Sequence, residues 1–167
     1  ESSDRIKSLI EDCRAHAESS NNIQLVDSVT AELIIIHTLS HLLIAEISLQ
    51  CGYSASSLSE RIYAQDGMRG ILIYTSTPDS EGTLGGLSSL AKPARFENIL
   101  LRALDSATWC SSDPLCFEKI LTISEPLNGA ACHSCLLLPE TTCELMNYFL
   151  DRGVLNDSSR LIRNNVV

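Results

Sequence analysis

Residues 28–51, with the sequence SVTAELIIIHTLSHLLIAEISLQC, form the strongest helix candidate of the chain and predict the centre of its fold. Ser28 is a suitable N-cap, and Gly52 suits the left-handed position after the last turn. Polar and ionisable side chains interrupt the apolar run, and these are Glu32, His37, Thr38, Ser40, His41, Glu46 and Ser48. The interruptions indicate a buried core helix rather than a membrane span.

A β-hairpin is expected after this helix. The segments Leu58–Ala64 and Gly70–Ser76 are rich in β-branched and aromatic residues, which favour strands. Residues 65–69 between them can form the turn of an antiparallel pair. Farther along, residues 93–108 predict an amphipathic helix, because apolar side chains recur at helical spacing and Pro93 stands in the first turn.

Both ends of the chain predict further helices. Residues 1–17 are expected to form a polar helix, and Pro139–Arg152 is expected to form a last helix that ends before Gly153. Residues 109–138 are irregular in pattern and rich in cysteine. We therefore expect an α+β fold, in which helices surround a small antiparallel hairpin or sheet and the irregular segment is stapled separately.

Composition limits both the architecture and the function. The chain has 167 residues, of which 44% are apolar and 20% charged, and this fits a globular protein. We expect a helical appendage over residues 1–25, a main domain over 26–155 and a polar tail over 156–167. A formal net charge of −9 disfavours autonomous, tight DNA binding, because an acidic surface repels phosphate. The sequence shows no signal peptide, so we expect a cytoplasmic, reducing environment.

Four of the seven cysteines form two pairs, Cys110-x5-Cys116 and Cys132-x2-Cys135, and 15 residues separate the pairs. A C-x2-C turn directs two thiolates at one ion, and the separation lets the other pair reach the same ion. Soft thiolates in a tetrahedral set favour zinc. Because four thiolates leave no open coordination position, we expect structural Zn²⁺ rather than catalytic zinc.

The spacing leaves alternatives open. Five residues inside the first pair exceed the usual two to four, so Cys143 and His133 are candidate substitutes for one ligand. An iron–sulfur cluster or a redox role would use the same thiols. In the simplest alternative, the cysteines are buried as small apolar side chains, which is also our interpretation of Cys13 and Cys51.

His37 and His41 lie four residues apart, on one side of the predicted central helix. One hypothesis places them in a polar pocket with Asp79 and Glu81, which would form a metal-dependent nuclease or hydrolase. The spacing lacks the glutamate of the HExxH motif, so it does not support zincin chemistry. The favoured hypothesis is that both histidines are hydrogen-bonded core residues and that the two carboxylates lock the neighbouring loop.

Lys92, Arg95 and Arg102 form the main local group of basic residues. A helix places Arg95 and Arg102, seven residues apart, on the same side. They are candidates for a contact with DNA or with a partner protein. A solvated helix face is the favoured interpretation, and the low aromatic content of 5% does not support reading of single strands by base stacking.

Several motifs occur in a fixed order, and these are HTLSH at 37–41, SLSERIY at 57–63, IYTSTPDSEGTLGG at 73–86 and NGAACHSC at 128–135. Together with Cys110 and Cys116, they resemble the four-cysteine MrfA zinc-binding (MZB) domain family over about residues 30–152. The run from Asn128 to Glu144 is most similar to the DrmB-like branch of that family, which belongs to bacterial DISARM anti-phage systems.

The resemblance implies structural zinc at the four paired cysteines and a non-enzymatic accessory role in a helicase-associated, DNA-processing complex. It implies a DrmA-like helicase, or the remainder of a longer polypeptide, as the partner, with DNA bound through the complex and no membrane contact. The chain has no GxxxxGK[ST] motif, so it is not a helicase by itself. A purely structural protein-interaction domain without DNA contact remains the alternative.

Overall fold

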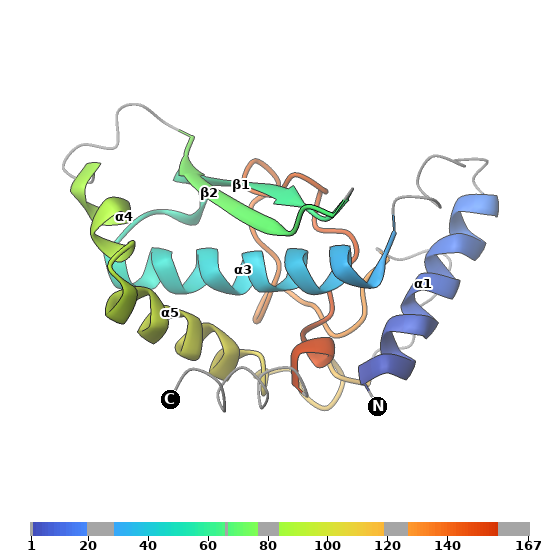
Figure 1. Cartoon of the computed structure of the whole chain (residues 1–167). Coiled ribbons are helices and arrows are strands. Elements are labelled where there is room, and N and C mark those ends of the chain that lie inside the picture. Colours follow the sequence, from blue (N-terminus) through green and yellow to red (C-terminus); the bar gives the residue numbers. More distant parts are fainter. Residues whose placement is uncertain (1, 20–28, 66, 77–83, 119–126, 157–167) are drawn as a thin grey trace.

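The central helix is α3, Ala31–Cys51, which crosses the middle of the molecule (Figure 1). Its N-cap is Thr30 and not Ser28, because the Thr30 hydroxyl accepts the Leu33 N–H at 3.1 Å and the helix begins one residue after it. The expected end is confirmed: Gly52 is left-handed, with φ 71°, and its N–H donates to the Ser48 carbonyl.

The computed structural model describes residues 2–19, 29–65, 67–76, 84–118 and 127–156. Within these ranges the chain forms helices and one two-stranded antiparallel sheet, so the predicted α+β class is confirmed. By length and composition alone, α3 could cross a membrane, but half of its most apolar stretch is buried inside the protein. It is the core helix that its polar interruptions predict.

The hairpin lies on one side of α3, and α5, Pro93–Ser106, lies on another (Figure 1). The strands of the hairpin are β1, Leu58–Tyr63, and β2, Gly70–Thr75. They pair antiparallel, with Leu58 opposite Thr75. Two short helices flank these elements, η1 at Ala55–Ser57 and α4 at Leu84–Leu90. Hairpin and α5 follow the predicted boundaries within two residues.

The N-terminal helix α1, Ser2–Ser19, packs against α3 and the short helix η2, Arg152–Val154. Its Leu9 and Cys13 are buried in the core. A helix made of the first residues was expected, and it contributes side chains to the same core as the rest of the described chain.

The predicted last helix over Pro139–Arg152 is wrong: this segment consists of turns up to the start of η2. Met146, Asn147 and Phe149 have φ of 52°, 60° and 63°, which are left-handed values that end any right-handed helix. The Asn147 side chain also bonds both the N–H and the carbonyl of Leu138, so it competes with helical hydrogen bonds. The apolar residues whose spacing predicted a helix belong instead to an irregular segment that packs on the core.

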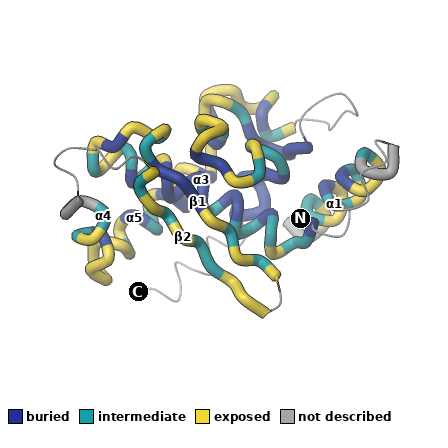
Figure 2. The backbone as a smooth tube through the Cα atoms, turned by 90° about the horizontal axis from the view of Figure 1, so that it is seen from above, coloured by how far each residue is buried: buried dark blue, intermediate teal, exposed yellow. Residues whose placement is uncertain are grey.

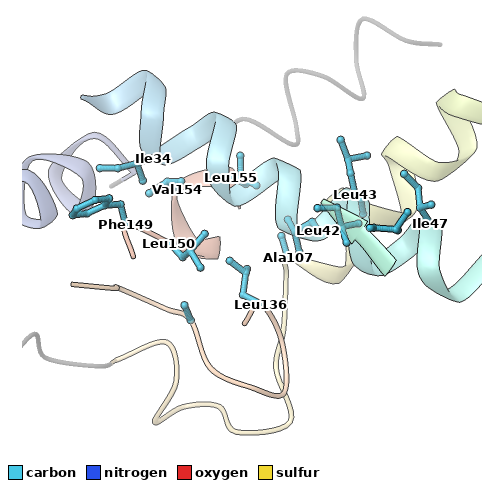
Figure 3. Packing of buried hydrophobic residues seen from close by; sticks show 14 of the residues in the cluster. Ile34, Leu42, Leu43, Ile47, Ala107, Leu136, Phe149, Leu150, Val154 and Leu155 are labelled. Carbon is cyan, nitrogen blue, oxygen red and sulfur yellow. The ribbon is translucent and has the colours of Figure 1, made fainter. Parts of the chain in front are cut away.

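The core surrounds α3, and this irregular C-terminal segment forms one side of it. Figure 3 shows Ile34 and Leu42 of α3 together with Leu136, Phe149 and Leu150, all of them buried. Seen from above in Figure 2, buried backbone follows α3, the start of β1 and the C-terminal segment, whereas α5 keeps an exposed outer face. Turns that would otherwise be surface loops therefore contribute buried side chains to the core, among them Leu136, Phe149 and Leu150.

Candidate metal centres

The two cysteine pairs bring their thiols to one point, which we call the cysteine cluster (Cys110, Cys116, Cys132 and Cys135). All four Sγ atoms lie within 4.8 Å of one another. The Sγ–Sγ distance is 3.5 Å between Cys110 and Cys132, and 3.7 Å from Cys135 to both Cys116 and Cys132. Four thiolates about 2.3 Å from a tetrahedral zinc lie about 3.8 Å apart, so this geometry fits zinc. None of the seven cysteines forms a disulfide.

Tight turns place both pairs. The Cys132 carbonyl accepts the N–H of Cys135 at 3.2 Å and of Leu136 at 2.9 Å, while the Cys132 N–H donates to the Cys135 Sγ at 3.3 Å. In the other pair, the Asp113 carboxylate accepts the Cys110 N–H at 2.7 Å, and the Cys110 Sγ accepts a backbone N–H at 3.4 Å. N–H groups aimed at sulfur stabilise the thiolate form that binds a metal.

Arg152 places a buried positive charge beside the cysteine cluster. Its guanidinium pairs with Asp113, hydrogen-bonds with Cys116 and donates to the Ala107 carbonyl at 3.1 Å. Burial tends to lower the pKa of Arg152, but the bond with Cys116 and the charge of Asp113 raise it, so the side chain stays cationic. Four thiolates around Zn²⁺ leave two net negative charges, and Arg152 offsets part of them.

Arg5 ties α1 to the same region. Its Nε donates to the Asp151 carboxylate at 2.9 Å, and its guanidinium donates to the Phe117 carbonyl at 3.2 Å while lying 4.5 Å from the centre of the Phe117 ring. Asp151 stands so close to Gly129 that any Cβ there would collide with the carboxylate. Phe117, the residue after Cys116, is therefore tied through Arg5 to Asp151.

Proton affinities differ within the cysteine cluster. Burial and the neighbouring Cys132 thiol raise the pKa of Cys116 to about 11, and burial raises the pKa of Cys135 further. Burial also acts to raise the pKa of Cys132, but hydrogen bonds with the Ser134 backbone and the surrounding thiols outweigh it and lower that pKa to about 6. A metal that binds all four thiolates must therefore displace protons from the other thiols.

Neither predicted substitute ligand joins the cysteine cluster. His133 is exposed, although it lies between two of the cysteines. Cys143 is buried in another group of side chains, which we call the His–Glu–Cys cluster (His37, His41, Glu60 and Cys143). The assignment of individual ligands stays a prediction, which the geometry favours for the four paired cysteines.

The His–Glu–Cys cluster lies between α3 and β1. The His37 Nε2 is 3.2 Å from the Cys143 Sγ and 3.1 Å from the Glu60 Oε1, and the His41 Nε2 is 3.4 Å from the same oxygen. The side chains of His37, His41 and Glu60 have no exposed surface. A nucleic acid cannot reach these histidines, so the geometry does not favour the nuclease hypothesis.

The environment separates the proton affinities of these groups as well. Burial lowers the pKa of His37, and its hydrogen bond with Glu60 offsets this only in part. Burial tends to raise the pKa of Glu60, but contacts with His37 and His41 lower it well below its usual value. Burial raises the pKa of Cys143 to about 12.

Sequence reasoning missed Glu60 and placed Asp79 and Glu81 opposite the two histidines instead. Asp79 and Glu81 lie outside the described residues, so that part of the hypothesis is untested. The sequence does contain a signal for Glu60. In a strand, residues two apart lie on the same face, and Glu60 stands between the apolar Leu58 and Ile62 on one face of β1. A carboxylate in such a position is expected to face the core and its histidines.

The predicted basic group lies on and just before α5. Lys92 and Arg95 are exposed near its start, where an Arg95 Nη donates to the Ser89 hydroxyl at 3.1 Å. The Arg102 Nε donates to the Asn98 side chain at 3.1 Å and lies 4.0 Å from the Glu46 carboxylate. A contact with DNA or a partner at this face stays a prediction.

Comparison with known proteins places the chain in a family. The sequence model of the MrfA Zn-binding domain matches residues 39–136, a stretch that contains all four residues of the cysteine cluster. The chain is also 42% identical, over 122 residues, to the DISARM protein DrmB of Bacillus paralicheniformis (strain ATCC 9945a / NCIMB 11709 / CD-2). That match covers 73% of this chain but 22% of the relative, so the chain spans about a fifth of that protein. The chain belongs to the MrfA zinc-binding domain family.

Proposed function

We propose that this domain is a non-enzymatic, zinc-stabilised accessory module of a cytoplasmic, helicase-associated complex that processes DNA in anti-phage defence. The convergence of four thiols inside the region matched by the family carries the proposal. The likeness to a DISARM protein supports the defence context. The partner is a larger DrmA-like helicase or the remainder of a longer polypeptide, and DNA is engaged through the complex.

The loop that holds the first cysteine pair supports a docking role. Trp109 immediately precedes Cys110 and is 66% exposed, and Leu115 immediately precedes Cys116 and is 81% exposed. Large apolar side chains held in solvent by a rigid support are typical of protein–protein contacts, and tryptophan is enriched among their strongest contributors. Zinc bound next to both side chains would fix their positions before a partner arrives.

The distribution of charge supports engagement of DNA by the complex rather than by this domain alone. The chain carries a formal net charge of −9, and zinc held by four thiolates makes the domain more acidic. The exposed Lys92 and Arg95 offer a local contact, and Arg102 has Glu46 nearby. A more basic partner must therefore supply most of the phosphate contacts.

Co-purification with the candidate helicase tests the docking step. We expect the double substitution Trp109→Ser and Leu115→Ser to weaken partner binding at least about tenfold, as loss of a central apolar contact does. Leu49→Ser is the matched control, because Leu49 is 79% exposed on α3 and lies far along the sequence from both pairs. Equal binding by both variants would place the docking surface elsewhere.

Binding of labelled DNA to the assembled complex tests the other step. We expect Lys92→Glu with Arg95→Glu to weaken binding, and Lys7→Glu with Arg14→Glu on the exposed side of α1 to leave it unchanged. No effect of the first pair would support a purely structural interaction domain without DNA contact. A nuclease assay with Mg²⁺ or Mn²⁺ and His41→Ala addresses the hydrolase hypothesis, for which we expect no activity from the wild type.

A further inference from the structure

We propose that the His–Glu–Cys cluster binds a second zinc ion, which joins α3, β1 and the turn at Cys143 into one unit. This site is separate from the cysteine cluster and does not depend on the proposed function. Its four donors come from three segments that are distant in sequence: two from α3, one from β1 and one from the irregular C-terminal segment.

The donor atoms already converge. One ligand atom from each of the four residues lies within 4.8 Å of the other three, the same criterion that the cysteine cluster meets. Three of these side chains have a buried atom that makes no hydrogen bond, and these atoms are the His37 Nδ1, the His41 Nε2 and the Glu60 Oε2. Buried polar atoms without hydrogen bonds are rare and costly, and a cation bound between the histidines and the Glu60 Oε1 would give the His41 Nε2 a partner.

The second ring nitrogen of His41 supports a metal ligand. The His41 Nδ1 lies 2.9 Å from the Leu136 carbonyl, which can only accept a hydrogen bond, so this nitrogen carries the proton. In the neutral ring the Nε2 then presents its lone pair toward Glu60. A histidine that donates one N–H to a carbonyl and offers its other nitrogen is the usual arrangement around protein-bound zinc.

The turn after Cys143 is shaped to support a thiolate. The Cys143 Sγ accepts the Leu145 N–H at 3.3 Å and the Asn147 N–H at 3.1 Å. Two residues of this turn, Met146 and Asn147, adopt left-handed φ values, which cost energy for residues other than glycine. Two N–H groups aimed at a single sulfur resemble the N–H contacts to sulfur in the cysteine cluster.

Charge balance also favours zinc in this place. Glu60 and Cys143 as anions, with two neutral imidazoles, neutralise one divalent cation, so the filled site carries no net charge. A neutral site avoids the large cost of a net charge in the protein interior. Nitrogen, oxygen and sulfur donors at tetrahedral number are the ligands that zinc takes in proteins.

Complete burial and four protein ligands define a structural site. No coordination position remains for water or substrate, and the histidine and glutamate side chains have no exposed surface. The ion would hold Cys143 against the hairpin, where the Glu60 N–H already donates to the Thr142 carbonyl at 3.1 Å. It would thereby stabilise the turns that replace the helix expected over residues 139–152.

Zinc content and zinc-edge X-ray absorption of the tag-free 167-residue chain test the proposal. We expect two zinc ions per chain, a sulfur shell at about 2.3 Å and a nitrogen or oxygen shell at about 2.0–2.1 Å. Cys143→Ser and Glu60→Gln should each lower the content from two to one and remove the lighter shell. Cys51→Ser, a half-buried cysteine outside both clusters, should retain two.

One zinc per wild-type chain with a sulfur-only shell would overturn the second site and leave the cysteine cluster intact. Retention of two ions in Cys143→Ser would overturn it too. One zinc with mainly nitrogen and oxygen ligands would support the second site and contradict zinc at the cysteine cluster, so the two claims fail separately. The wild-type result decides even if a variant does not fold.

Discussion

The cysteine cluster and the His–Glu–Cys cluster each bring four ligand atoms together, but they do so on different kinds of backbone. The cysteines stand on irregular turns near the surface, and Cys132 and Cys135 are partly exposed. The histidines and Glu60 stand on α3 and β1, which pack against each other and have their own backbone hydrogen bonds. The turns therefore depend on their ligand contacts for order, whereas the helix and strand form without them.

Charge separates the two regions as well. Zinc with four thiolates keeps two negative charges and has Arg152 beside it, whereas zinc with two histidines, Glu60 and Cys143 is neutral. A net charge is tolerated where solvent and a guanidinium lie close, and neutrality is needed where neither does. Each site thus carries the charge that its surroundings accept.

The largest expected effect comes from breaking the cysteine cluster. Cys132→Ser should lower the free energy of unfolding by several kcal/mol or more, because structural zinc contributes about 10–16 kcal/mol of apparent binding energy. Hydrogen exchange should show protection lost over residues 110–118 and 127–137 before α3. Cys51→Ser should change stability by less than about 1.5 kcal/mol. Similar losses of stability in Cys132→Ser and Cys51→Ser would contradict the claim that the turns depend on their ligand contacts more than α3 does.

The next effect concerns the buried cation. Arg152→Met should destabilise the chain by about 3–5 kcal/mol, because it leaves Asp113 without its partner and the thiolates without a nearby positive charge. Arg61→Met is the matched control: Arg61 pairs with Glu144 at 2.9 Å but is 60% exposed, so about 0–1 kcal/mol is expected. Urea unfolding measures both, and equal values would contradict a role for Arg152 at the cluster.

Acid should act through the His–Glu–Cys cluster. Burial lowers the pKa of folded His37, whereas the unfolded residue takes up a proton near about pH 6.5. Below that pH the unfolded state binds one more proton at this residue, so His37 should lower stability as pH falls, by at most about 1.4 kcal/mol per pH unit. The lowered pKa of Glu60 adds a loss of the same sign at more acid pH.

Urea unfolding between about pH 7.5 and 5.5 measures this slope. His37→Gln should reduce it, and His133→Gln, at an exposed position, should not. Stability that rises on acidification in the wild type would show that the folded chain binds the proton more tightly, contrary to the burial of His37.

The smallest expected effect concerns the turn after Cys143, and the sign of the change in stability is the test. Met146 is 64% exposed with φ 52°, so Met146→Gly should be neutral or stabilise the chain by up to about 1 kcal/mol. In a helix the same change would destabilise by about 1 kcal/mol. Met68→Gly, at another exposed methionine, controls for loss of the side chain. A destabilised Met146→Gly would favour the helix that the sequence predicts.

Local signals in the sequence predict the regular elements well. The hairpin, α5 and the end of α3 depend on alternation, helical spacing and a glycine cap, all of which act over a few residues. The convergence of the cysteines follows from their spacing and identity. The prediction for segment 139–152 fails because its conformation depends on partners outside it. Phe149 and Leu150 are buried in the core, and the Asn147 side chain bonds the Leu138 backbone.

Long-range contacts explain the other omissions. Arg152 lies 39 residues from Asp113, and Arg5 lies 146 from Asp151, distances at which no local pattern pairs them. Thr30 replaces Ser28 as the cap because both residue types suit that position, and packing decides which one the helix uses. The sequence makes Cys143 a candidate substitute ligand for the cysteine pairs, whereas the turn directs its thiol to His37.

Anomalous diffraction at the zinc absorption edge from crystals of this chain tests the central claim most directly, because it locates the metal atom itself. The account predicts a strong peak about 2.3 Å from the Sγ atoms of Cys110, Cys116, Cys132 and Cys135. Crystals of the folded chain with these thiols unliganded, or with zinc held by other residues only, would contradict it.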